Sequence, residues 1–392
     1  MADFYERSVI IHEQLRGKIG IANKIPIETR DDLSIAYTPG VARPCEIIAA
    51  DPARARDLTI KHNAVAVVSD GSAVLGLGNI GALAALPVME GKALLFKEYA
   101  NIDAWPLCLD TQNTDEIVQT VRHIAPVFGG INLEDIAAPR CFEVESQLQD
   151  LGIPVFHDDQ HGTAIVLLAA LINAARVLDR DLPDMKVVVS GAGAAGTAIA
   201  RLLRCVNFDL NLCVPVDDII VCDSQGIIDP QRERLSPEKQ ELLGYTNRHQ
   251  RKGSLRDALE AADVFIGVSK GNLLTADDVR TMAPGPIILA MANPEPEIMP
   301  DEARKGGAAI VGTGRSDFPN QVNNVLVFPG IFRGALDAGA SAIDGGMKLA
   351  AAQALANAVD EPTADKILPT PLDRTVAPRI AEAVRQAAPE VR

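Results

Sequence analysis

A glycine-rich turn between a short apolar run and an alanine-rich stretch constrains the fold of this 392-residue chain more than any other feature. Residues 186–190, KVVVS, are followed directly by Gly191, Gly193 and Gly196 in G-x-G-x-x-G spacing. In dinucleotide-binding turns the first glycine permits a tight bend, the second lets the backbone approach a pyrophosphate, and the third lets helix and strand pack closely. Because strand, turn and helix come in the required order, the pattern predicts a Rossmann-type, doubly wound domain.

An acid at the end of the next apolar run completes this pattern. Residues 219–222 form that run and Asp223 follows it, suited to accept hydrogen bonds from ribose hydroxyls. The acid comes later than the usual ~20 residues, because the segment 206–218 intervenes, and we assign that segment no role. The predicted cofactor site comprises Gly191, Ala192, Gly193, Ala194, Ala195, Gly196 and Asp223.

The same acid bears on the choice of cofactor. A free carboxylate at this position favours NAD, because it repels a 2'-phosphate. The next residues, Ser224 and Gln225, carry no charge that would attract one. Arg232 or Arg234 could still supply, from the following loop, the basic side chain that attracts a 2'-phosphate. NAD is therefore predicted, with NADP left open.

A second glycine pattern lies earlier in the chain. Gly76, Gly78 and Gly81 also match G-x-G-x-x-G, but the preceding residues are less apolar and no acid follows a clear second strand. The motif without its context predicts a dinucleotide site poorly. We interpret it as a structural or substrate-side turn.

Two acidic pairs, Glu134 with Asp135 and Asp158 with Asp159, indicate a divalent-metal site. Carboxylates are the hard oxygen ligands that Mg²⁺ and Mn²⁺ prefer. Acidic residues are more often found on solvated turns. The second pair, however, follows the apolar run 153–156, and open α/β folds place their ligands at the carboxyl ends of such strands.

Composition excludes several classes of partner. The net charge of -15 argues against nucleic acid or an anionic membrane. Neither an export signal nor an uninterrupted apolar run of roughly 18 to 20 residues is present. The six cysteines form no C-x-x-C pair, which favours reduced thiols and a cytoplasmic enzyme.

The chain divides near residue 160 into a predicted N-terminal α/β catalytic domain, residues 1–162, and a cofactor-binding domain with C-terminal helices, residues 163–392. Apolar runs alternate with helical patterns in the first part, which predicts short buried strands. Predicted strands cover residues 64–69, 93–96, 126–131 and 153–156, and predicted helices cover 114–124, 141–151, 163–178, 340–359 and 374–388. We expect the active site in the cleft between the two domains.

Two further residues are candidates for proton transfer. Lys92 precedes the predicted strand 93–96, and a lysine partly buried beside a cleft can have its pKa lowered and serve as a general base. Tyr37 precedes a Pro-Gly turn. On residue type alone, a surface lysine and a structural tyrosine are the more common roles.

The chain resembles bacterial-type, short-form malic enzymes over nearly its whole length. The segments that carry the resemblance are AYTPGVARPC, VVSDGSAVLGLGNIG, LPVMEGKALLFK, INLEDIAAPRCFE, PVFHDDQHGTA, SGAGAAG, MANPEPEI and VNNVLVFPGIFRGALD. This resemblance implies NAD(P)-dependent oxidation and decarboxylation of L-malate to pyruvate and CO2. A symmetric dimer or tetramer is also implied, although the sequence does not say whether Tyr37 acts in its own subunit or across an interface.

The resemblance also implies individual roles. By position in the matching segments, Tyr37 corresponds to the general acid and Lys92 to the general base. The implied metal ligands are Glu134, Asp135 and Asp159, and Asp158 supports them. Asn293 and Asn324 correspond to residues that hold the substrate and the nicotinamide side. The chain departs from larger, eukaryotic-type members at Ala73, where those carry an arginine that clamps a substrate carboxylate. Asn293, Asn324 or Arg43 could replace that clamp.

Three alternatives stay open. A malolactic enzyme on the same scaffold would keep NAD bound and release lactate. A non-catalytic regulatory or binding protein would have little use for Tyr37, Lys92 and three metal-type carboxylates. An amino-acid dehydrogenase of similar build would leave those carboxylates unexplained.

Overall fold

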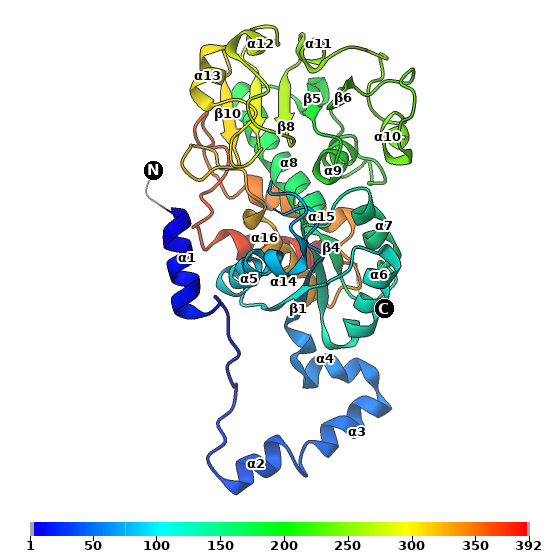
Figure 1. Ribbon diagram of the computed structural model, residues 1–392, viewed down its shortest axis with the longest axis vertical. Coiled ribbons are helices and arrows are strands. Elements are labelled where there is room, and N and C mark those ends of the chain that lie inside the picture. Colours follow the sequence, from blue (N-terminus) through cyan, green and yellow to red (C-terminus); the bar gives the residue numbers. More distant parts are fainter. Residues whose placement is uncertain (1–3, 75, 390–392) are drawn as a thin grey trace.

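The computed structural model describes residues 4–74 and 76–389, and it contains two sheets surrounded by helices (Figure 1). The first sheet has the strand order β2-β1-β3-β4, and all neighbouring strands are parallel. Its strands are β1 (Ala64–Ser69), β2 (Asp103–Cys108), β3 (Gly130–Leu133) and β4 (Val155–His157). Strands β1, β3 and β4 are buried along their whole length, as expected for a parallel sheet covered on both faces.

The second sheet confirms the predicted Rossmann-type fold. Its order is β10-β9-β8-β5-β6-β7, parallel except for the β6–β7 pair. Its strands are β5 (Lys186–Ser190), β6 (Asp218–Asp223), β7 (Gly226–Ile227), β8 (Val264–Gly267), β9 (Ile287–Ala290) and β10 (Ile310–Thr313). The strand order reverses at β5, so the glycine turn that follows β5 lies at the point where doubly wound sheets bind their ligands.

Helices connect and cover these sheets. Those up to the end of the first sheet are α1 (Phe4–Leu15), α2 (Arg30–Ala36), α3 (Ala42–Ala50), α4 (Ala55–Leu58), α5 (Gly81–Ala100), α6 (Thr114–Ile124) and α7 (Arg140–Gln147). Those after it are α8 (Asp158–Leu178), α9 (Ala194–Leu203), α10 (Pro237–Leu242), α11 (Leu255–Leu259), α12 (Ala276–Arg280), α13 (Pro300–Lys305), α14 (Phe328–Ala338), α15 (Gly345–Ala356) and α16 (Val376–Ala387). Short 3-10 turns are η1 (Pro52–Arg54), η2 (Ile60–His62), η3 (Ala125–Val127), η4 (Leu182–Asp184) and η5 (Asn324–Leu326).

Helix α8 links the two sheets and passes between them (Figure 1). It begins at Asp158, five residues before the predicted start at Thr163. Length and composition alone would allow α8 to cross a membrane, but 67% of its apolar window is buried inside the protein, as in the central helix of a globular core. The predicted domain boundary at residues 162 and 163 falls within α8, and that division stays a prediction.

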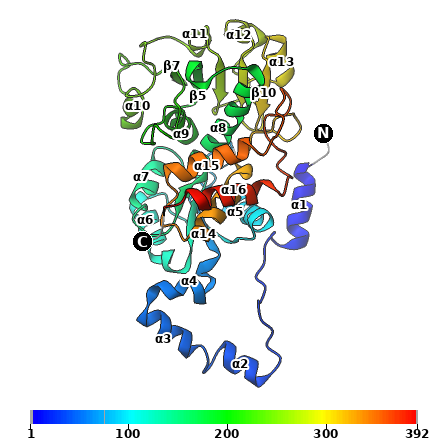
Figure 2. The ribbon, with the colours of Figure 1, turned by 180° about the vertical axis from the view of Figure 1, so that it is seen from behind.

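The C-terminal helices pack back onto the first sheet and its helices (Figure 2). Helix α14 contacts both α5 and α16. The ring of Phe96 lies edge-to-face with Phe328 at 4.8 Å and with Phe332 at 5.3 Å between centroids. Phe332 also contacts Phe156 at 5.7 Å. Residues from the end of the chain therefore close the core beside the first sheet.

The predicted strand at residues 93–96 is wrong. These residues belong to α5, and the strand that pairs with β1 is β2. A short apolar run fits a buried helix as well as a buried strand, and of these four residues only Ala93 and Phe96 are buried in α5. Pro106 is tolerated within β2 because β2 is an edge strand.

The expectation that all cysteines are reduced is also contradicted. Cys205 and Cys213 form a disulfide, with Cα atoms 5.8 Å apart, across the start of the segment 206–218. The four other cysteines are free. Spacing in the sequence could not reveal this pair, because the bond depends on how a loop folds back beneath α9.

An arm formed by α1, α2 and α3 extends from the body of the protein (Figures 1 and 2). None of the described residues in these three helices is buried. Lys18 anchors the arm to α5: its backbone N–H donates to Glu90 at 3.1 Å and its ammonium donates to the carbonyl of Pro87 at 2.6 Å.

Candidate active site

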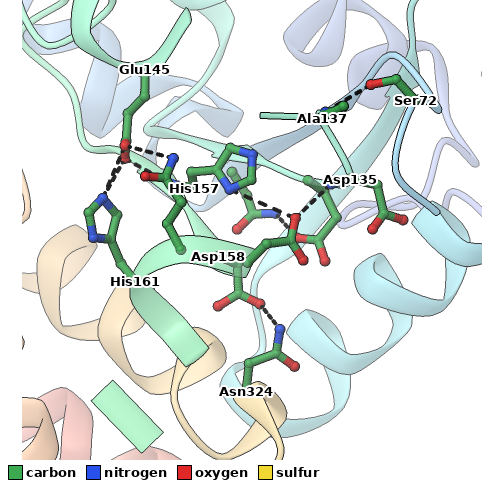
Figure 3. A network of polar contacts seen from close by, with 12 residues as sticks. Ser72, Asp135, Ala137, Glu145, His157, Asp158, His161 and Asn324 are labelled. Carbon is green, nitrogen blue, oxygen red and sulfur yellow. Dashed lines mark hydrogen bonds and ion pairs between the residues drawn. The ribbon is translucent and has the colours of Figure 1, made fainter. Parts of the chain in front are cut away.

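The two acidic pairs meet because β3 and β4 are adjacent and parallel, with Leu133 opposite His157. Glu134 and Asp135 follow β3, and Asp158 and Asp159 begin α8 directly after β4. Asp135 has a left-handed φ of 54°, which aspartate tolerates better than most residues. Its backbone N–H donates to Asp159 Oδ2 at 2.8 Å, which holds the two loops together (Figure 3).

Three of these acids form a cluster that fits a divalent metal. One carboxylate oxygen from each of Glu134, Asp135 and Asp159 lies within 4.8 Å of the others. Asp135 Oδ2 is buried without a hydrogen-bond partner among the described residues, and Glu134 accepts one bond from Asn132 Nδ2 at 2.8 Å. An all-oxygen donor set with an unpartnered buried oxygen suits Mg²⁺ or Mn²⁺.

Electrostatics favour a cation at this cluster. Burial raises the pKa of Asp135 to about 9, and the carboxylates of Asp159 and Glu134 add to the effect. Burial likewise raises the pKa of Glu134 to about 7 and that of Asp159 to about 6. Carboxylates that resist ionising when alone are stabilised in their charged form by a nearby cation.

Lys92 lies beside this cluster, on α5, with only 7% of its side chain exposed. Its Nζ is 2.5 Å from Asp158 Oδ2, 2.8 Å from Glu134 Oε1 and 3.9 Å from the ring centroid of Phe328. Burial alone would lower the pKa of Lys92, but the carboxylates of Asp158, Glu134 and Asp159 outweigh it and raise that pKa above its ordinary value. The metal-free site therefore holds a charged lysine.

Asp158 joins Lys92 to the C-terminal part of the chain. The same Oδ2 atom accepts a hydrogen bond from Asn324 Nδ2 at 2.6 Å (Figure 3). Gly162 is necessary here, since a Cβ at that position would lie 1.8 Å from Asp158 Oδ1. The fully buried Asp158 thus orients Lys92 and Asn324 rather than facing the three-carboxylate cluster.

Sequence reasoning missed several groups that support the site. Asn132 bonds to Glu134, and Phe328 covers Lys92. One turn along α8, His161 Nε2 lies 2.9 Å from Glu145 (Figure 3). Its Nδ1 lies 3.2 Å from Lys348. Asn132 could have been found from its place in β3, two residues before Glu134, whereas the others depend on tertiary packing.

The glycine turn after β5 has the geometry of a pyrophosphate cradle. Gly191 has a φ of 122°, and a Cβ added at this position would lie 2.7 Å from the carbonyl oxygen of Val268. A Cβ added at Gly196 would lie 1.8 Å from the carbonyl oxygen of Gly191. Gly193 faces open space and caps α9 without a side-chain hydrogen bond. The first amides of α9 are thus free of a side-chain cap, as a phosphate site requires.

The expectation of a free acid at the end of β6 is wrong. Arg232 donates to both carboxylate oxygens of Asp223, at 2.9 and 2.8 Å, and Lys239 donates to Oδ2 at 2.6 Å. Arg234, the other candidate, is exposed. Although burial opposes it, hydrogen bonding to Arg232 and Lys239 lowers the pKa of Asp223 to about 2.

The earlier glycine turn faces the second sheet. All three glycines have positive φ, and a Cβ on Gly76 would lie 2.7 Å from the carbonyl oxygen of Asn293. Asn293 is exposed and begins a cis peptide with Pro294. Ala73, just before the turn, donates its backbone N–H to the carbonyl of Asp135 at 3.0 Å. This turn therefore lies between the carboxylate cluster and the Asn293 loop that follows β9.

Tyr37 and Arg43 are not brought to this site within one chain. Tyr37 ends α2 with 68% of its surface exposed, and α2 lies at the far end of the arm (Figures 1 and 2). Arg43 is exposed on α3 and pairs with Glu46 at 2.9 Å. The site of one chain thus contains Lys92, Asn324 and the acidic residues but not the second candidate for proton transfer.

Comparisons with known proteins agree with this geometry. Family models for the malic enzyme N-terminal domain and the malic enzyme NAD-binding domain match residues 16–149 and 160–389. The chain is 53% identical to a bifunctional malic/malolactic enzyme of Bacillus subtilis, over 98% of this chain and 93% of that one. It is 55% identical to an NAD-dependent malic enzyme of Geobacillus stearothermophilus, over 98% and 78%.

A solved structure shares the fold as well. The crystal structure of an NAD-dependent malic enzyme from Thermotoga maritima superimposes with a TM-score of 0.91 at 46% identity, covering 96% of this chain and 98% of that one. Two domain models, close relatives and a shared structure thus agree along nearly the whole sequence. The chain belongs to the malic enzyme family.

Proposed function

We propose that this protein catalyses the metal-dependent oxidative decarboxylation of L-malate to pyruvate and CO2, with reduction of NAD or NADP. The observation that carries the proposal is the position of Lys92 Nζ, within 2.8 Å of Glu134 in a cluster of three metal-type carboxylates. The glycine cradle after β5 supports the dinucleotide part of the proposal. Relatives with this activity at about half identity support it further.

The side chains around Lys92 can each be assigned a role that their positions allow. Lys92 Nζ would accept the proton of the C2 hydroxyl, and Asp158 would hold the lysine side chain in place. Asn324, fixed by Asp158, would donate to substrate through its remaining amide hydrogen. Phe328 and the buried walls around Lys92 would keep water away from the reacting atoms.

A divalent cation and a dinucleotide would supply chemistry that the side chains cannot. When bound, a divalent cation supplies a Lewis acid for the oxygens of the substrate and offsets the carboxylate charge around Lys92. When bound, the dinucleotide supplies the acceptor for the C2 hydride. The residues that would hold the cation are Glu134, Asp135 and Asp159.

We also propose that the protein is a homodimer and that the arm of one chain brings Tyr37 to the active site of its partner. The arm exposes many large apolar side chains, which a monomer rarely does. They include Phe4, Tyr5, Val9, Ile10, Leu15, Ile21, Ile35 and Tyr37. A second copy would cover these groups, and the Tyr37 hydroxyl could then protonate C3 of the enolate that decarboxylation leaves.

A malolactic reaction is the second candidate, because the relative from Bacillus subtilis carries both activities in its name. An assay with L-malate, Mn²⁺ and either NAD or NADP distinguishes the two if pyruvate, lactate and reduced cofactor are measured separately. Reduced cofactor with equal pyruvate supports the malic reaction. Lactate without reduced cofactor selects the malolactic one, and no turnover with either cofactor contradicts both.

A further inference from the structure

The carboxylate of Asp223 has no acceptor capacity left for a ribose. Its Oδ1 accepts from the Gln225 backbone N–H at 2.9 Å and from Arg232 at 2.9 Å, and its Oδ2 accepts from Arg232 at 2.8 Å and Lys239 at 2.6 Å. An ionised carboxylate offers about four lone-pair positions, and these four bonds use them. A ribose hydroxyl could bond to Asp223 only by displacing one of these donors.

The local charge is positive rather than negative. One carboxylate faces one guanidinium and one ammonium, which leaves a net charge of +1 at the end of β6. The side chains of Arg232 and Lys239 are 16% and 31% exposed, so both remain accessible to solvent beside the end of β6. Arginine binds phosphate bidentately, and a lysine adds a point charge beside it.

We propose that Arg232 and Lys239 are specificity-determining residues that let the ribose pocket of this chain take a 2'-phosphate, so that it binds NADP more tightly than NAD. This inference rests on the proposed dinucleotide site. On binding NADP, the two cations transfer hydrogen bonds from Asp223 to the phosphate. On binding NAD, Asp223 must first give up one donor before it can accept from the ribose hydroxyls.

The test uses fragments that differ only by the 2'-phosphate. The full-length protein is titrated calorimetrically with 2',5'-ADP and with 5'-AMP. Wild type is expected to bind 2',5'-ADP about tenfold more tightly. Arg232→Gln should weaken 2',5'-ADP binding by roughly ten- to hundredfold, the effect of losing one or two charge-assisted bonds, and change 5'-AMP binding by less than about threefold. Lys239→Gln should act in the same direction with a smaller loss.

Arg234→Gln is the matched control, since Arg234 lies in the same loop and is exposed, and it should change neither affinity. Asp223→Asn removes the competing anion and should leave 2',5'-ADP binding equal or tighter. Equal affinity of wild type for both fragments, or equal weakening of both by Arg232→Gln, would overturn the inference. Turnover of malate is measured on the same samples. If malate is not turned over, the proposed function is contradicted. If malate is turned over but Arg232→Gln leaves the preference for 2',5'-ADP over 5'-AMP as in wild type, only this inference is contradicted.

Discussion

The carboxylate cluster and the N-terminal arm are built in opposite ways. The cluster lies at the carboxyl ends of β3 and β4, and Glu134, Asp158 and Lys92 are buried there with every distance set by packed elements. The arm holds Tyr37 on an exposed helix end with no buried neighbour in its own helix. A single chain therefore brings Lys92 and the carboxylates together, whereas Tyr37, the proposed acid, would need a second surface to position it.

Replacing the base should have the largest effect on catalysis. Lys92→Ala removes the group that exchanges the hydroxyl proton and leaves Asp158 and Glu134 without their cation. We expect kcat for malate oxidation to fall by about 10² to 10⁴. Reduced-cofactor formation measures the loss, and unchanged binding of the dinucleotide serves as the control. Retention of more than a tenth of wild-type kcat would remove Lys92 from the mechanism.

Tyr37→Phe should lower pyruvate formation by about 10² without touching stability. Because the side chain is 68% exposed in one chain, the loss of its hydroxyl should not change the melting temperature of isolated subunits. Reduction of added oxaloacetate to malate needs no protonation at C3, so it should persist. Full pyruvate formation by this variant would make the arm irrelevant to the chemistry.

Removing one ligand should weaken metal binding with the fold intact. Asp135→Asn keeps the left-handed backbone, which asparagine tolerates, but replaces a charged oxygen that points into the cluster. Substitution of residues that only hold the ligands in place lowers metal affinity ~10–100-fold, so replacing a ligand should lower the affinity for Mn²⁺ by at least as much. Calorimetric titration with Mn²⁺ measures it, and Glu143→Gln, an exposed acid on α7, is the control. Equal Mn²⁺ affinity in the variant and the wild type would place the ion elsewhere.

The smallest expected effect is on pH-dependent stability. The pKa values of Glu134 and Asp135 are raised in the folded, metal-free protein to about 7 and about 9. Their contribution to the free energy of unfolding is therefore fully present below the pKa of about 4 that they have in the unfolded chain. It is lost as the pH rises through their pKa values in the folded protein. Metal-free protein should melt lower at pH 8 than at pH 6.

Saturating Mn²⁺ should reverse that trend. At a hundredfold excess over Kd, binding contributes about 2.7 kcal/mol, which is roughly 3 °C for a chain of this size. The shift should be larger at pH 8, where fewer protons compete for the carboxylates. Thermal unfolding with and without Mn²⁺ measures it, and a shift that is larger at pH 6 would contradict the charges assigned to the cluster.

The same contrast explains how much of the molecule could be predicted from the sequence. The Rossmann turn was predicted because strand, turn and helix are consecutive between residues 186 and 203. The metal site could be predicted because the second acidic pair follows the apolar run 153–156, and the structure shows that the first pair follows the adjacent parallel strand. Both patterns are local, so short stretches of sequence carry them.

Other features depend on distant contacts. The apolar residues 93–96 predict a strand after Lys92, because a run of four residues is too short to show the periodicity of the helix α5 to which they belong. Phe328 reaches Lys92 from 236 residues further along the chain. Arg232 turns Asp223 from a free acid into a paired one through a loop whose path the sequence does not reveal. Tyr37 lies on an exposed arm in one chain, so its proposed action on a partner's site also depends on contacts outside its own sequence neighbourhood.

Subunit mixing tests the central claim, that one chain's base works with its partner's Tyr37. Lys92→Ala and Tyr37→Phe subunits are each purified, unfolded together in equal amounts and refolded, and pyruvate formation from L-malate is measured. If the arm acts across a dimer, half of the dimers are mixed and each has one intact site, so activity should recover to about a quarter of that of wild type treated identically. If activity stays at the level of the separate variants while mixed dimers are present, Tyr37 does not act across the interface and the account is contradicted.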